Sequence, residues 1–185
     1  PGVITVNAKK FLDIIKSFPA CELSFELNNN QMKIYSKDKG DKAVFKINTL
    51  PKEDYPEFPI AQNPYFELSQ QDFKDMIKKT IYVISHETGR YFLNGVFFHK
   101  EENKFKMVAT DGRRLAYAEK ECNVAILDFY VIIPEKILTE LMKVCNEGTI
   151  KISIEPKQLF FQIDDYYYNS VVLEGTFPDY KKVIP

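Results

Sequence analysis

The chain has 185 residues, of which 45% are hydrophobic and 28% charged, so it is long enough to bury a core and polar enough to stay soluble. Its formal net charge of −1 argues against a histone-like or sequence-reading basic protein, although a local basic face can coexist with an acidic remainder. No segment approaches the ~20 apolar residues of a membrane span and no signal peptide is visible, so we expect a cytoplasmic protein with no membrane partner.

The first third of the chain predicts one unit made of a strand, a helix and three strands. The first strand ends near Val6, and apolar residues at helical spacing follow it. Alternating segments then predict strands over Glu22–Leu27, Gln31–Ser36 and Ala43–Asn48. The Pro-rich segment 54–59 is expected to join this unit to the next.

The remainder predicts two further units of the same kind. In the first, Ser69 is expected to cap a helix, with Asp72 three residues later. Its strands are predicted over Tyr91–His99, Lys104–Thr110 and Arg114–Glu119. In the second, strands are predicted over Thr149–Ile154, Gln158–Ile163 and Tyr167–Leu173.

An internal repeat links the first unit to the last. Adding 127 to a residue number turns Val6 into Ile133 and Thr49-Leu50-Pro51 into Thr176-Phe177-Pro178, with no gap between them. A constant offset over this length indicates that one supersecondary unit is used twice. We therefore expect an α+β fold with helices on one face of antiparallel sheets. Residues 1–61 would form half a domain and residues 62–185 a complete domain.

Three motifs occur in order along the chain. They are Arg90-Tyr91-Phe92-Leu93-Asn94-Gly95, then Ala109-Thr110-Asp111-Gly112-Arg113-Arg114-Leu115, then the closing residues 177–185. Asp-Gly is a tight-turn dipeptide, and the two arginines after it place cations beside an apolar surface. Together the motifs resemble the bacterial sliding clamp family, the β subunit of DNA polymerase III.

The resemblance implies a fold, a function and partners. Family members contain three copies of a domain built from two such units. Residues 1–61 would then be the second half of domain 1 and residues 62–185 all of domain 2, within a longer protein. The implied function is that of a non-catalytic processivity factor, a ring-shaped homodimer that encircles duplex DNA without reading its sequence. It would tether the polymerase III catalytic subunit, the clamp loader and repair polymerases through short peptide motifs.

The resemblance also assigns a hydrophobic pocket for Gln/Leu/Phe-bearing peptides, which the third domain completes in the family. Its expected residues are Leu93, Thr110, Gly112, Arg113, Leu115, Pro178 and Val183. Gly112 would let a ligand approach the backbone, and Leu93 and Leu115 would be apolar walls. Taken singly, each of these two leucines would be interpreted as an ordinary core residue.

Basic residues are candidates for contact with DNA phosphates. The helices carry Lys9 and Lys16, their repeat equivalents Lys136 and Lys143, and also Lys74 and Lys78. Arg90 and Tyr91, in a polar loop, and Lys182 complete the expected set. A solvated helix face and an ordinary connecting loop remain the alternatives, and Glu87 in that loop would repel phosphate.

A subunit interface is implied at Lys10, Ile14, Phe45 and Ile47, with an exposed edge strand around Phe45. No catalytic, metal or cofactor motif is found: His86 and His99 lack metal-ligand spacing, and Asp111 is explained as a turn residue. An enzyme that acts on phosphate esters is therefore a distant alternative. The nearer alternative is a peptide-binding module of the same fold that does not encircle DNA.

Overall fold

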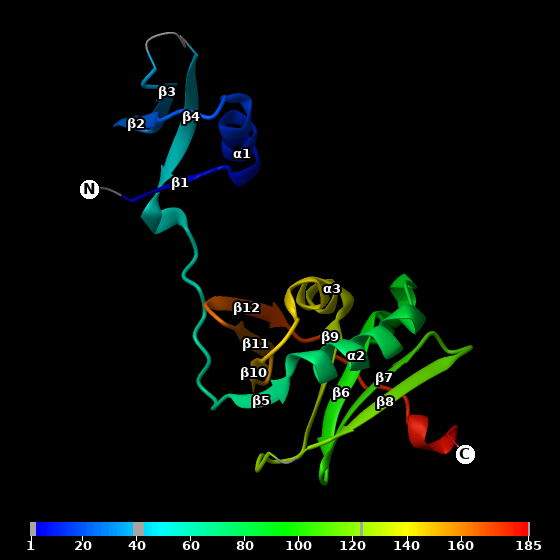
Figure 1. Cartoon of the computed structure of the whole chain (residues 1–185). Coiled ribbons are helices and arrows are strands. Elements are labelled where there is room, and N and C mark those ends of the chain that lie inside the picture. The colour runs from blue at the N-terminus through cyan, green and yellow to red at the C-terminus, as the bar shows by residue number, and fades with distance from the viewer. Residues whose placement is uncertain (1–2, 39–42, 123, 185) are drawn as a thin grey trace. The chain divides into compact units, whose positions relative to one another are not determined.

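The computed structural model describes residues 3–38, 43–122 and 124–184, which form two compact units (Figure 1). Unit 1 extends to Phe58 and unit 2 begins at Pro59, so the boundary lies inside the Pro-rich segment. Of the helices in these described ranges, none is long and apolar enough to cross a membrane.

Unit 1 is a helix packed on a four-stranded antiparallel sheet. Its elements are β1 (Ile4–Val6), α1 (Ala8–Ser17), β2 (Leu23–Asn28), β3 (Gln31–Ser36) and β4 (Val44–Pro51). The side chain of Asn7 starts α1 by accepting a hydrogen bond from the backbone N–H of Lys10 at 3.0 Å. The strand order is β1-β4-β3-β2, which leaves β2 at an edge. The core contains Ile14, Met32, Ile34 and Ile47.

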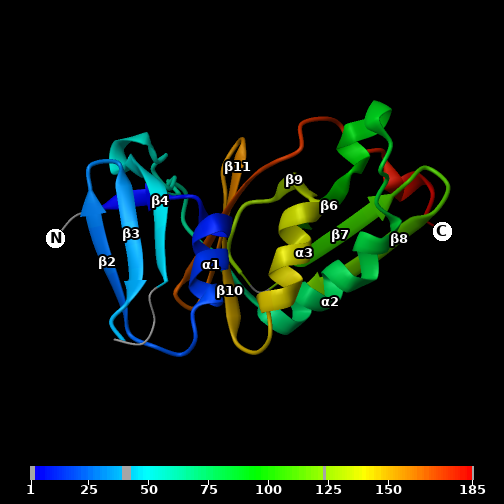
Figure 2. The same cartoon turned by 90° about the horizontal axis from the view of Figure 1, so that it is seen from above.

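Unit 2 has two antiparallel sheets within its described residues. One has the order β12-β11-β10-β5 and the other β8-β7-β6-β9. The strands are β5 (Phe66–Ser69), β6 (Gly95–Glu101), β7 (Lys104–Thr110), β8 (Leu115–Glu121), β9 (Phe129–Pro134), β10 (Thr149–Ile154), β11 (Gln158–Ile163) and β12 (Tyr166–Val171). The helices α2 (Gln70–Thr80) and α3 (Glu135–Val144) lie side by side against them (Figure 2). This arrangement confirms the expected α+β fold.

The helices of unit 2 bury their apolar faces between the two sheets. Phe73 of α2 and Leu138 of α3 are fully buried, together with Phe98 of one sheet and Phe161 of the other. The cap predicted at Ser69 is confirmed, since its hydroxyl accepts a hydrogen bond from the N–H of Asp72 at 3.3 Å.

Two sequence predictions about secondary structure are wrong. Tyr91–Leu93 is not extended but ends a short 3₁₀ helix, Thr88–Leu93, and β6 begins only at Gly95. The N–H of Asn94 donates to the carbonyl of Tyr91 at 3.0 Å, a turn that alternation of apolar residues could not reveal.

The constant repeat offset is also wrong for the third strand. Gln31 pairs with Asn48 in unit 1, whereas Gln158 pairs with Val171 in unit 2, an offset of 123. The hairpin between β11 and β12 is shorter than the one between β3 and β4. As a result, Thr49–Pro51 pairs with β1, whereas residues 176–178 follow β12 outside any strand.

Candidate functional site

The turn between β7 and β8 is held by its own side chains. The hydroxyl of Thr110 donates to the carbonyl of Arg114 at 2.7 Å and accepts from the N–H of Gly112 at 3.0 Å. Asp111 Oδ1 accepts from the N–H groups of Arg113 and Arg114 at 2.9 and 3.0 Å. Gly112 has a φ of 86°, a conformation that glycine adopts at little cost.

Two other segments meet this turn. The 3₁₀ helix Thr88–Leu93 delivers Leu93, which is 3% exposed, and the closing segment of the chain delivers Phe177 and Tyr180. Together with Val108 and Ile132, these three side chains form a small apolar cluster, and Leu115 packs against it. The cluster gives the region between the three segments an apolar base.

A cavity of about 580 Å³ lies on this base. Its lining includes all seven residues expected for a peptide pocket: Leu93, Thr110, Gly112, Arg113, Leu115, Pro178 and Val183. Val183 is 69% exposed and forms part of the rim, whereas Leu93 is buried at the base. The structure therefore brings these residues together, and whether they bind a peptide stays a prediction.

Three cationic side chains line this cavity. Arg90, Arg113 and Arg114 all line it, and Arg114 Nε donates to Asp111 Oδ2 at 3.0 Å. The N–H groups of Arg113 and Arg114 lower the pKa of Asp111, so the turn carboxylate stays ionised. Arg90 had been assigned to a DNA-contacting loop, but its guanidinium lies 3.1 Å from where a Cβ on Gly112 would be.

Five further residues line the cavity without having been expected there: Arg90, Phe92, Arg114, Asp179 and Tyr180. Phe92 and Arg114 are adjacent in sequence to expected lining residues, so the motifs could have indicated that they also line the cavity. Asp179 and Tyr180 belong to the closing motif, but their contact with the turn depends on tertiary packing.

The expected DNA-contacting lysines fall into two groups. Lys9, Lys16, Lys78 and Lys136 are exposed, and no ion pair of theirs occurs among the described residues. Lys74 is half-buried and donates to the carbonyl of Cys145 at 2.5 Å, Lys143 pairs with Glu140 at 2.8 Å, and Lys182 pairs with Asp179 at 3.1 Å.

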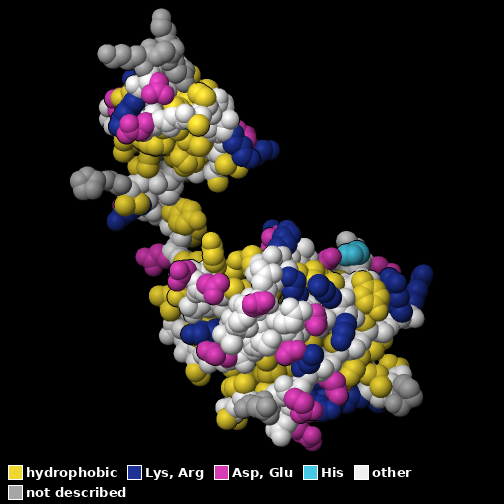
Figure 3. All heavy atoms as spheres, in the orientation of Figure 1, with side chains coloured by type: hydrophobic (Ala, Val, Ile, Leu, Met, Phe, Trp, Pro, Cys, Tyr) yellow, Lys and Arg dark blue, Asp and Glu magenta, His cyan; other side chains and the backbone are white. Residues whose placement is uncertain are grey.

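Lys74 therefore joins α2 to the end of α3, so its ammonium group is already engaged. In unit 2 the Lys and Arg side chains are interspersed with acidic ones on the face shown in Figure 3. Tyr91 is 54% exposed and remains accessible for the stacking expected of it.

The expected subunit interface is only partly accessible in unit 1. Ile14 is 9% exposed and Ile47 is 2% exposed, so both side chains serve the core of the unit. Lys10 is exposed and Phe45 is half-buried. Phe45 pairs with Ile34 of β3, and in the described register β1 covers only Thr49–Pro51 of β4.

Within the described ranges, no group of three or more His, Cys, Asp or Glu side chains is arranged to hold a metal ion.

Comparison with known proteins gives a consistent result. The family model for the DNA polymerase III beta subunit, central domain, matches residues 67–179, and that for the N-terminal domain of the same subunit matches residues 1–59. The chain is 32% identical over 189 residues to the beta sliding clamp of Salmonella typhimurium and 33% identical over 187 residues to that of Treponema pallidum. Both alignments cover 100% of this chain and 50% of the relative, so the chain spans about half the length of these curated relatives.

Solved structures agree with the sequence comparison. The DNA polymerase sliding clamp from Bacillus subtilis matches with a TM-score of 0.88 at 29% identity, over 100% of this chain and 49% of that chain. The DNA polymerase III beta chain from Streptococcus pneumoniae matches with a TM-score of 0.87 at 28% identity, over 98% of this chain and 48% of that chain.

Proposed function

The chain belongs to the family of DNA polymerase III beta subunits, the sliding clamps, and from this premise we propose that it acts as a non-catalytic processivity factor. Residues 1–61 would be the second half of the first clamp domain and residues 62–185 the complete second domain. In the whole protein these domains would belong to a ring-shaped homodimer around duplex DNA. The ring would raise the effective concentration of a tethered polymerase at the primer end.

The observation that carries this proposal is the cavity between the β7–β8 turn, the 3₁₀ helix and the closing segment. Leu93 and Leu115 supply apolar contact area, and Gly112 presents backbone without a side chain in the cavity wall. Recognition of a peptide needs such a small desolvated centre, surrounded by polar groups that fix its orientation. The arginines that line the cavity meet that second requirement.

The exposed helix lysines support the DNA part of the proposal. Lys9, Lys16, Lys78 and Lys136 are long cationic side chains without described ion pairs. Flexible ammonium groups bind phosphates without reading bases, as a clamp that slides along DNA requires. Arg90, Tyr91 and Lys182 are retained as further candidates for DNA contact.

The test is a fluorescence-anisotropy titration of a labelled polymerase-tail peptide against the chain and two variants. Leu115→Asp places a carboxylate at the apolar wall, and we expect it to weaken binding by at least tenfold. Leu127→Asp is the matched control, because Leu127 is 90% exposed and does not line the cavity. Equal affinities for both variants, with unchanged circular dichroism, would show that the cavity is not the binding site.

A further inference from the structure

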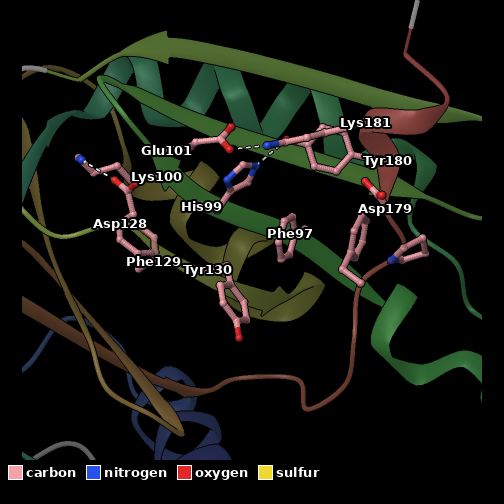
Figure 4. Close-up of a pocket in the computed structure, with 12 residues that line it drawn as sticks. Phe97, His99, Lys100, Glu101, Asp128, Phe129, Tyr130, Asp179, Tyr180 and Lys181 are labelled. Carbon is pink, nitrogen blue, oxygen red and sulfur yellow. Dashed lines mark hydrogen bonds and ion pairs between the residues drawn. The ribbon is translucent and has the colours of Figure 1, made fainter.

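Unit 2 has a second cavity, of about 460 Å³, which the sequence motifs did not predict. It lies where β6, the start of β9 and the closing segment of the chain come together (Figure 4). Its volume is within the roughly 300–1,000 Å³ of typical ligand pockets. The nature of its lining therefore decides what could occupy it.

Aromatic rings dominate this lining. Phe97 and Phe177 are stacked with their centroids 4.8 Å apart and their planes at 7°. Tyr130 lies beside Phe97 at 6.2 Å and is 76% exposed. The same three residues also line an adjacent hollow of about 500 Å³, so the aromatic surface continues beyond the cavity. Such a surface favours another aromatic ring, which can stack or meet an edge.

The charged groups around the cavity already have partners. Lys100 is 7% exposed and its ammonium lies 2.9 Å from Asp128. Glu101 accepts hydrogen bonds from Lys106, at 2.5 Å, and from Lys181. These two bonds lower the pKa of Glu101 to about 2, so it stays ionised and paired. Because these opposite charges already neutralise one another, the described residues of the lining offer no unpaired charge to a ligand, which favours an uncharged one.

His99 and the hydroxyl of Tyr180 are neutral polar groups that line the cavity. His99 is 7% exposed and its Nε2 lies 2.7 Å from the hydroxyl of Tyr180. Burial lowers the pKa of His99 to about 4, so the imidazole is uncharged at neutral pH. No hydrogen bond occurs at its Nδ1 among the described residues, which leaves that atom available to a ligand.

The two cavities share a wall. Pro178, Asp179 and Tyr180 line the second cavity and also the cavity of the β7–β8 turn. A peptide that crossed this segment from the first cavity would meet the lining of the second.

We propose that the aromatic cavity binds a neutral aromatic side chain on the flank of the peptide that occupies the first cavity. This inference rests on the proposed function, because it assumes that a peptide is bound next door. The flanking ring would pack against Phe97 and Tyr130. An aromatic pair of this kind should strengthen binding about three- to tenfold.

The test uses three synthetic peptides with the same Gln/Leu/Phe-type anchor. Two carry one Trp, joined by a short Gly/Ser spacer at either the amino or the carboxyl end, and the third carries Ala in place of Trp. The chain contains no tryptophan, so emission from the peptide reports the surroundings of this residue alone. We expect one Trp peptide to bind more tightly than the Ala peptide, with a blue-shifted emission.

The variant Tyr130→Ala should abolish this gain, measured as the affinity ratio of the Trp and Ala peptides. Tyr166→Ala is the matched control, because Tyr166 is 68% exposed and lies outside both cavities. The proposal is wrong if neither Trp peptide gains affinity, or if the gain survives Tyr130→Ala. Self-association of the chain that Tyr130→Ala abolishes, without any gain from Trp, would assign the cavity to a second copy and also overturn the proposal.

Failure of the proposed function would look different. In that case the Ala peptide itself would not bind saturably, or Leu115→Asp would leave its affinity unchanged.

Discussion

Acidification should destabilise unit 2 through His99. The folded protein holds this imidazole neutral, with a pKa of about 4, whereas the unfolded chain restores its ordinary value of 6.5. Between these two values the unfolded state binds more protons, so the free energy of unfolding falls as the pH is lowered. The contribution is complete above pH 6.5 and is lost on descending to pH 4.

The size of the effect follows from the two pKa values. Each pH unit between them corresponds to about 1.4 kcal/mol, which gives about 3 kcal/mol as the upper limit. The largest cause is burial, to which Lys106 adds, while Glu101 opposes it. Glu101 itself acts in a lower window, because its stabilising charge is lost only as the pH falls from 4.5 towards 2.

The assay is urea unfolding at several pH values between 7 and 4, followed through the histidine ring signals in NMR spectra. His86 and His99 are the two histidines of the chain, so the spectrum should contain one Hε1 signal for each. His99→Gln should flatten the pH dependence, whereas His86→Gln at the exposed site should preserve it. A His99 signal that titrates near 6.5 in the folded protein would refute the reasoning.

Four further substitutions test other parts of the structure. Gly112→Ala forces a side chain into a φ of 86°; it should destabilise the chain by about 1 kcal/mol in urea unfolding and weaken peptide binding. Ser69→Ala removes the cap of α2 and should cost about 1 kcal/mol by the same measurement, with peptide affinity unchanged. Lys74→Met should cost about 1 kcal/mol because it removes the bond to the carbonyl of Cys145, but it should leave DNA binding unaltered. Lys78→Met should instead weaken DNA binding and leave the free energy of unfolding unchanged. The slope of log DNA affinity against log salt concentration should become shallower by about one. Equal effects of these two lysine changes on DNA binding would contradict the structural role of Lys74.

Much of the fold could be predicted because local patterns and tertiary packing agree. The strands Gln31–Ser36 and Gln158–Ile163 have the expected bounds, since alternation of apolar residues follows the pleat directly. The error at Tyr91–Leu93 arose because a run of apolar residues fits a strand as well as a 3₁₀ turn. The failed repeat offset arose because hairpin length shifts pairing without changing which residues are apolar.

The sequence predicted which motif residues would line the candidate site, but it did not predict the residues that tertiary packing adds to it. Motif resemblance assembled the seven expected lining residues, yet nothing local revealed that Asp179 and Tyr180 would join them. The same holds for Ile14 and Ile47, whose burial depends on how α1 lies on its sheet. The aromatic cavity was missed because Phe97, Tyr130 and Phe177 come from three separate segments with no shared motif.

The segment Pro178–Tyr180 belongs to the walls of both cavities, so a displacement of it would couple them thermodynamically. Any ligand that displaces it in one cavity also changes the shape of the other. If a ligand in one cavity changes the affinity of the other cavity by some factor, then a ligand in the other cavity must change the affinity of the first by the same factor. A small molecule bound among the aromatic rings could therefore inhibit peptide binding without occupying the peptide's own contacts.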